Sequence, residues 1–131
     1  MSAVYLDASA FVKVIVKEPE STAVRRFLSR SDARRISSAL LKTEALMAIR
    51  HLGPEALGTA RAALRQVNLV AVNDRILDRA GELDPSILRT LDAIHLATAL
   101  AIGPDLDTIV TYDGRMMEGA RSLGLPVVAP R

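Results

Sequence analysis

Residues 90–103, TLDAIHLATALAIG, have the pattern of a helix that is buried on most of its surface. Thr90 can cap its start and the Gly103-Pro104 pair ends it, while strong helix formers fill the interior. Asp92 falls in the first turn, and His95 follows one turn later on the same face. A carboxylate in such an apolar helix is unfavourable unless it is paired, complements the helix dipole or binds a cation. The stretch alone leaves the dipole role and the cation role of Asp92 equally open.

The composition is that of a globular chain. Of its 131 residues, 50% are hydrophobic and 24% are charged, which suits a single core. The absence of cysteine excludes disulfides, zinc–thiolate sites and thiol nucleophiles. No stretch approaches the ~20 apolar residues of a membrane span, and no secretory signal is visible. We therefore expect one domain over residues 1–131 and a cytoplasmic location.

Short apolar runs alternate with helical patterns along the chain. Strands are expected over residues 3–6, 35–38, 67–72, 107–112 and 125–129. Helices are expected over residues 8–17, 19–29, 39–52, 54–66, 74–82, 90–102 and 114–123, with a break at Pro85. Such alternation favours a parallel sheet that is covered on both faces. The sequence therefore predicts an α/β fold, a three-layer α/β/α sandwich with a central parallel sheet of about four to five strands.

Two aspartates stand at the ends of expected strands. Asp7 directly follows the run 3–6, Asp113 follows 107–112, and each precedes a helix. In open parallel sheets, ligands bind beyond the carboxyl ends of the strands, where the path of the chain across the sheet reverses. Two acids at two such ends point to one crevice, although either aspartate taken singly is equally well explained as a helix cap.

Glu44 has apolar neighbours on its expected helix. The residues three and four positions away are Leu40, Leu41, Met47 and Ala48. A glutamate aligned with a buried stripe needs a partner, and Lys42 and Arg50 lie on other faces of the helix. The pattern favours a buried functional carboxylate, and the alternative is a glutamate at the edge of the stripe that reaches solvent.

Four acids are thus expected to lie in one site: Asp7, Glu44, Asp92 and Asp113. Hard oxygen donors in this number suit Mg²⁺ or Mn²⁺. Without a cation, crowded carboxylates repel one another, so some are expected to stay protonated. Metal-assisted phosphoryl chemistry follows, because a bound cation lowers the pKa of an attacking water and stabilises the leaving oxygen. With these acids gathered in one site, the rest of the chain would be basic and would suit a polyanionic substrate, although composition alone favours an ordinary surface of mixed charge.

Four segments spread over the chain match one family in order and register. They are YLDASAFVK (5–13), TEAL (43–46), LRTLDAIHLA (88–97) and TYDGR (111–115). With them, the chain resembles the PIN-domain family, and more narrowly the VapC-type ribonuclease toxins of type II toxin–antitoxin systems. The resemblance implies a Mg²⁺-dependent endoribonuclease, with Mn²⁺ as a possible substitute, that cleaves single-stranded or structured RNA.

The resemblance also implies roles for individual residues. The catalytic and metal-binding acids are Asp7, Glu44, Asp92 and Asp113. The Ser9 hydroxyl matches the family's hydroxyl after the first acid, where it orients a carboxylate or a water, and Thr111 matches the small polar residue before the fourth acid. Arg115 stands where some PIN nucleases carry a further acid, which leaves the number of metal ions open.

Partners follow from the same resemblance. They are an RNA substrate, a second copy of the chain in a homodimer, and a VapB-like antitoxin whose tail lies across the groove. An arginine of that tail is expected to bridge two of the acids, and the tail is expected to cover apolar surface beside Glu44, at Ala45, Met47, Ala48 and Ile49. Possible RNA contacts are Lys13, Arg89 and Arg115, and Tyr112 is the best-placed aromatic for base stacking.

Other roles for His95 and other protein families can be compared with the sequence. His95 is either a general base or, as we favour, a buried histidine with satisfied hydrogen bonds. A response-regulator receiver needs an acidic pair before the first helix, and a haloacid-dehalogenase-type phosphatase needs a second aspartate at position 9; the chain has neither. A catalytically silent PIN-like scaffold that binds RNA or a protein ranks below the nuclease, because all four acids are present.

Overall fold

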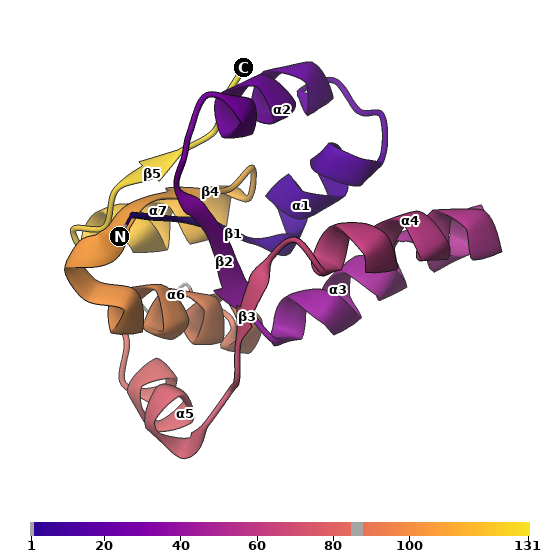
Figure 1. Cartoon of the computed structure of the whole chain (residues 1–131). Coiled ribbons are helices and arrows are strands. Elements are labelled where there is room, and N and C mark those ends of the chain that lie inside the picture. The colour runs from indigo at the N-terminus through magenta and orange to yellow at the C-terminus, as the bar shows by residue number, and fades with distance from the viewer. Residues whose placement is uncertain (1, 85–87) are drawn as a thin grey trace.

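A five-stranded sheet forms the centre of the computed structural model, which describes residues 2–84 and 88–131 (Figure 1). The strands lie in the order β3-β2-β1-β4-β5, and all neighbours pair in parallel. They are β1 (Ala3–Leu6), β2 (Arg34–Ser38), β3 (Asn68–Val70), β4 (Leu106–Val110) and β5 (Val127–Val128). The predicted parallel sheet is confirmed.

Helices cover both faces of this sheet. They are α1 (Ala8–Ile15), α2 (Ser21–Ser29), α3 (Leu40–Ile49), α4 (Pro54–Leu64), α5 (Asp74–Gly81), α6 (Thr90–Ile102) and α7 (Gly114–Ser122). Helices α1 to α4 share a hydrophobic core with one face, and α6 and α7 share a core with the other. Helix α5 packs against α6 through a third, smaller cluster. The three-layer α/β/α sandwich predicted from the sequence is therefore confirmed.

The middle strand β1 contributes side chains to the hydrophobic cores on both faces of the sheet. Val4 and Leu6 point to the α1–α4 side, and Ala3 and Tyr5 point to the α6–α7 side, as the two-residue period of a strand requires. All four side chains are buried. A strand buried on both faces has no alternation of polar residues, which is why 3–6 is a continuous apolar run.

The path of the chain reverses beside β1. After β1 the chain adds β2 and β3 on one side of it, and then crosses to add β4 and β5 on the other side. The carboxyl ends of β1 and β4 therefore flank the switch point, where open parallel sheets bind ligands. Asp7 follows β1 directly, and Asp113 lies three residues beyond β4.

The central helix α6 matches its prediction except at its first residue. Residues 93–99 are all buried, as the apolar pattern requires. Thr90 is the first helical residue and not the cap, because Asp92 in the first turn accepts a hydrogen bond from the backbone N–H of Arg89, at 3.4 Å. The helix therefore begins one residue earlier than the Thr90 cap predicts.

Other boundaries shift by a few residues. The helix expected over 39–52 ends as an α-helix at Ile49 and tightens into a 3₁₀ turn, Arg50–Leu52, before Gly53. Gly53 has a φ of 99°, a value that favours glycine. The last strand has only two residues, and the expected break at Pro85 lies outside the described residues. Within the described ranges, no helix combines the length and the apolar character that crossing a bilayer demands.

Candidate active site

Asp7 is the most buried of the four predicted acids, with 4% of its surface exposed. It ends β1 and caps α1: its Oδ1 accepts hydrogen bonds from the Ala10 N–H at 3.0 Å and from the Ser9 hydroxyl at 2.7 Å. Its Oδ2 accepts from the Thr111 hydroxyl. Burial raises the pKa of the Asp7 carboxyl, and the hydrogen bonds from Thr111 and Ser9 oppose that shift. Burial is thus the main cause of the raised pKa of Asp7, whereas the sequence predicts that repulsion between the acids keeps some of them protonated.

Two hydroxyls tie the end of β1 to the end of β4. Ser9 Oγ accepts from the Tyr112 N–H at 2.9 Å while it donates to Asp7. Thr111 Oγ1 accepts from the Asp113 N–H at 3.0 Å while it donates to Asp7. Each hydroxyl therefore uses both its donor and its acceptor capacity, which fixes Asp7 relative to Asp113. These hydrogen bonds show how Ser9 and Thr111 hold the side chain of Asp7 and the backbone that follows β4.

Asp113 is the cap of α7. Its Oδ1 accepts from the N–H groups of Arg115, at 2.8 Å, and Met116, at 3.2 Å. Both aspartates at strand ends are thus helix caps, as the simpler interpretation held. Capping does not compete with cation binding here, because both cap bonds of Asp113 use one oxygen.

The predicted burial of Glu44 is only partly right. The buried stripe of α3 consists of Leu41, Ala45 and Ile49, and Met47 on Glu44's side of the helix is 57% exposed. The Glu44 side chain is 21% exposed, so it lies at the edge of the stripe. The sequence misled because α3 is apolar on nearly all sides, and such a helix does not reveal which stripe faces the core.

The partner of Glu44 is His95 of α6. His95 Nε2 lies 2.6 Å from Glu44 Oε1, and His95 Nδ1 lies 2.6 Å from the Tyr5 hydroxyl. The Tyr5 oxygen accepts from the Ser38 N–H, and burial raises the pKa of Tyr5, so the hydroxyl keeps its proton and donates it to Nδ1. This assigns the remaining ring hydrogen to Nε2, which donates to Glu44. The interpretation of His95 as buried and fully hydrogen-bonded is confirmed.

Sequence reasoning did not pair Glu44 with His95. Both residues, however, are polar side chains among mostly apolar neighbours, and such a side chain needs a partner. Fifty-one positions separate them in the chain. Only the packing of α3 and α6 around the sheet brings them together.

Asp92 lies in the first turn of α6 beside a cation. Its Oδ2 is 3.9 Å from Arg115 Nε, and its side chain is mostly buried. Arg115, which replaces the further acid of some PIN nucleases, therefore sits among the acids and offsets part of their charge. Arg89 is exposed at the start of the same helix.

Lys13 lies on the opposite side of the site. Its Nζ donates to Glu20 at 2.9 Å and is 3.7 Å from Glu18, and it sits 5.0 Å from the centre of the Tyr112 ring. Ser9, Lys13 and Tyr112 line one shallow cavity of about 380 Å³. Of the three basic residues proposed to contact RNA, Lys13 is thus already paired with carboxylates, and Arg115 is close to one.

The four acids suit a hard divalent cation in chemistry, because all are oxygen donors. Thr111 contacts Asp7, Arg115 contacts Asp92 and His95 contacts Glu44. Over residues 2–84 and 88–131, however, no three acidic or histidine side chains stand close enough together to form a metal site as they are placed.

Comparison with known proteins agrees with this architecture. Residues 4–121 match the model of the PIN domain. Ribonuclease VapC46 of Mycobacterium tuberculosis (strain ATCC 25618 / H37Rv) is 51% identical over 130 residues, with 99% of each chain covered. The crystal structure of M. tuberculosis VapC20, described as a sarcin–ricin loop cleaving toxin, matches with a TM-score of 0.77 at 18% identity over 97% of this chain and 99% of that one. A toxin–antitoxin complex from Klebsiella pneumoniae matches with a TM-score of 0.74 at 20% identity over 99% and 98%. The chain therefore belongs to the PIN-domain family, as a toxin ribonuclease of the VapC type.

Proposed function

We propose that this ribonuclease hydrolyses single-stranded or structured RNA with a divalent cation, Mg²⁺ or Mn²⁺, held by Asp7, Glu44, Asp92 and Asp113. The observation that carries the proposal is the placement of Asp7. A buried carboxylate is retained at the switch point of the sheet although burial raises its pKa. A nearby cation would offset that unfavourable burial, and a carboxylate held by three donors is already oriented to bind one.

The cation would supply positive charge against the phosphate and acidify the attacking water. The protein's own groups do the positioning. Ser9 and Thr111 hold Asp7, and His95 holds one oxygen of Glu44 and leaves the other oxygen free for a ligand. Lys13, Arg89 and Arg115 lie around the acids, where they would contact the phosphates that flank the cleaved bond.

Metal-dependent cleavage can be tested directly. The purified protein is incubated with single-stranded RNA in Mg²⁺, in Mn²⁺ and in excess EDTA, and the products are analysed for their termini. Hydrolysis by a water nucleophile should leave a 5′-phosphate, and only in the presence of the cations. Undiminished cleavage in EDTA would refute the role assigned to the acids.

We further propose control by a VapB-like antitoxin and assembly as a homodimer. The Klebsiella pneumoniae neighbour is a toxin–antitoxin complex, which supports such a partner here. Met47 and Ala48 expose apolar surface on α3 beside Glu44, where an antitoxin tail would bury it, whereas Ala45 and Ile49, also expected there, are buried. Co-expression with the antitoxin should inhibit cleavage, and Glu44→Ala should weaken the complex. Equal binding of both forms would contradict this mode of inhibition.

A further inference from the structure

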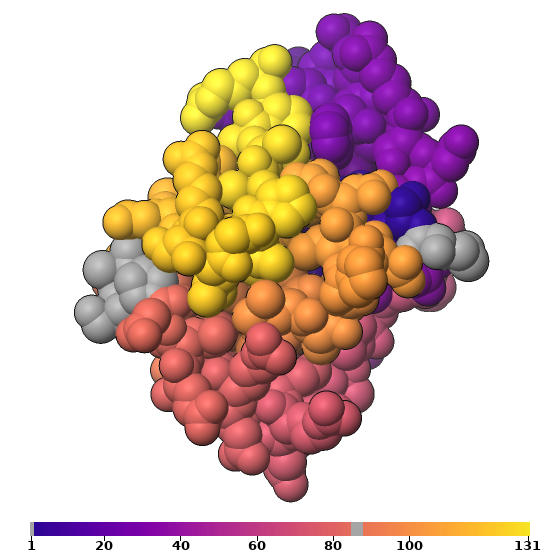
Figure 2. Space-filling view, turned by 90° about the vertical axis from the view of Figure 1, so that its left-hand side faces the viewer, coloured from indigo at the N-terminus to yellow at the C-terminus, as the bar shows by residue number. Residues whose placement is uncertain are grey.

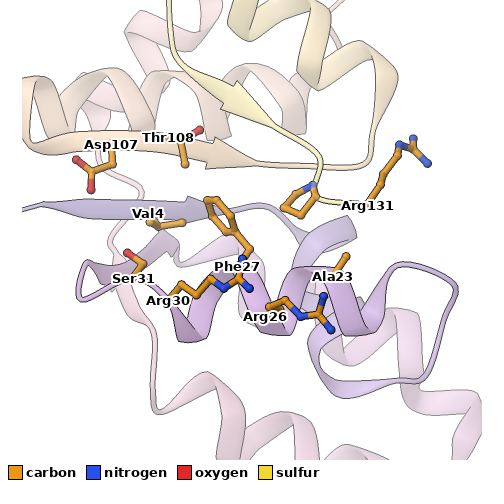
Figure 3. Close-up of a pocket in the computed structure, with 10 residues that line it drawn as sticks. Val4, Ala23, Arg26, Phe27, Arg30, Ser31, Asp107, Thr108 and Arg131 are labelled. Carbon is orange, nitrogen blue, oxygen red and sulfur yellow. The ribbon is translucent and has the colours of Figure 1, made fainter.

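We propose that a cavity beneath α2 binds phosphate groups of the RNA outside the acidic site. The proposal rests on the function proposed above, because it assigns a second contact to the same substrate. The cavity has a volume of about 590 Å³ and lies between α2, the strands β1 and β4, and the C-terminal segment (Figure 3). This volume is within the range of small-ligand pockets. Three arginines line it, Arg26, Arg30 and Arg131, against one acid, Asp107.

The two arginines of α2 are free to bind an anion. Arg26 and Arg30 stand one turn apart, are exposed, and project along the cavity (Figure 3). Within residues 2–84 and 88–131, neither forms an ion pair with a carboxylate. Like charges at this spacing repel each other, and an anion between them would relieve the repulsion. Arg25, by contrast, uses its Nε to bind the Val14 carbonyl at 2.9 Å.

The third arginine connects the cavity to the acidic site. Arg131 Nη1 lies 3.4 Å from Glu20 Oε1, and the other oxygen of Glu20 accepts from Lys13. Lys13 lies over Tyr112, whose hydroxyl donates to the Pro130 carbonyl at 2.6 Å. The C-terminal segment lies beside α2 in both overall views (Figures 1 and 2). Lys13, which lines a cavity with Ser9 and Tyr112, is thus connected through Glu20 to Arg131 at the arginine cavity.

The distance and the lining favour RNA over an acidic protein segment. Val4 of β1 lines the cavity and lies three residues before Asp7, so about 10 Å of strand separates the two regions. Guanidinium groups bind phosphates bidentately, whereas the Phe27 ring points from α2 towards the strands and forms the apolar floor of the cavity (Figure 3). Asp107 and Arg131 lie at opposite ends of the cavity, so the acid does not block the arginines.

The test is a double variant, Arg26→Gln with Arg30→Gln, measured by fluorescence anisotropy with labelled single-stranded RNA in EDTA at several salt concentrations. Loss of two phosphate contacts should weaken binding roughly tenfold and reduce the log–log salt slope by about 1.4. The matched control removes the same number of charges at the same spacing from another helix: Arg75→Gln with Arg79→Gln on α5, which should change binding little. Equal losses in both pairs, or no loss in the α2 pair, would overturn the proposal.

Two further measurements separate this proposal from the proposed function. In Mg²⁺ the α2 variant should show a raised KM and an unchanged kcat, because the cavity binds RNA away from the reacting bond. Failure of the wild type to cleave would refute the metal mechanism, while the binding measurement in EDTA would still report on the cavity. A labelled polyglutamate peptide that binds more tightly than RNA, in an Arg26- and Arg30-dependent manner, would overturn the RNA assignment in favour of a protein partner.

Discussion

The acidic site and the arginine cavity are both charged, but the protein builds them in opposite ways. Asp7 is buried and accepts three hydrogen bonds, and Glu44 is held by a histidine that is itself held by Tyr5. Arg26 and Arg30 are exposed and have no such supports among the described residues. Fixed, partly desolvated charges suit chemistry, because their fields are weakly screened. Exposed charges suit association and weaken with salt. Changes in the first region should therefore alter the chemical step, and changes in the second should alter binding.

The largest effect is expected for Asp7→Asn. This change removes one oxygen donor and the negative charge, and we expect cleavage to fall by more than the ~10–100-fold that loss of a residue supporting a metal ligand causes. RNA binding in EDTA should be preserved or strengthened, because a charge that repels phosphate is lost. Initial rates and anisotropy on the same preparation measure the two effects. If Asp7→Asn cleaved RNA at the wild-type rate, the assignment of the chemical step to the acidic site would be wrong.

A smaller loss of activity is expected at His95. His95→Leu removes the donor to Glu44, and we expect cation affinity to fall roughly 10–100-fold. His95→Gln places an amide N–H near the former Nε2 position, so it should restore most of that affinity. Mn²⁺ titration followed by electron paramagnetic resonance measures binding without relying on turnover. The control is Ser21→Ala, which removes a buried hydroxyl bond on α2 far from the acids. Equal affinities in His95→Leu and wild type would contradict the positioning role.

A stability effect with a definite pH dependence follows from Asp7. Burial raises the folded-state pKa of Asp7, so the contribution of this carboxyl to stability is most favourable below the usual pKa of aspartate, about 3.9, and is lost as the pH rises through the folded-state value. Asp7→Asn has no such loss. In EDTA, its melting temperature should exceed that of the wild type by a few degrees at neutral pH, and the difference should shrink towards pH 4.

Asp92→Asn is the control for this experiment. The contact of Asp92 with Arg115 is long, 3.9 Å, and an asparagine oxygen can still accept from the Arg89 N–H, so Asp92→Asn should change stability by about 0.5 kcal/mol or less. A lower melting temperature of Asp7→Asn across the whole range would show that the lost hydrogen bond outweighs the relief of charge burial.

The two regions also differ in how far the sequence reveals them. Asp7 and Asp113 follow apolar strands, and the switch-point rule then places them together, because strand ends and chain direction are local signals. The link from Glu44 to His95 joins α3 and α6, which cover opposite faces of the sheet, and the apolar residues on most sides of α3 do not reveal it. The cavity is less predictable still. Arg25, Arg26 and Arg30 look alike in the sequence, and only the fold turns Arg25 towards a backbone carbonyl and leaves the other two open.

The smallest effect is expected when a serine is replaced by alanine, and the same substitution can be made in both regions. Ser9→Ala leaves the Tyr112 N–H without its acceptor and takes one donor from Asp7, so we expect a loss of about 1–2 kcal/mol in stability and a several-fold fall in cleavage. Ser29→Ala on α2 removes an exposed bond to the Arg26 carbonyl, and it should change stability by less than about 0.5 kcal/mol and leave cleavage intact. Urea unfolding and initial rates measure both variants. If Ser29→Ala reduced stability and cleavage as much as Ser9→Ala does, the Ser9 hydroxyl would contribute no more than an ordinary surface hydroxyl. The distinction between a site held by hydrogen bonds and an exposed arginine cavity would then be wrong.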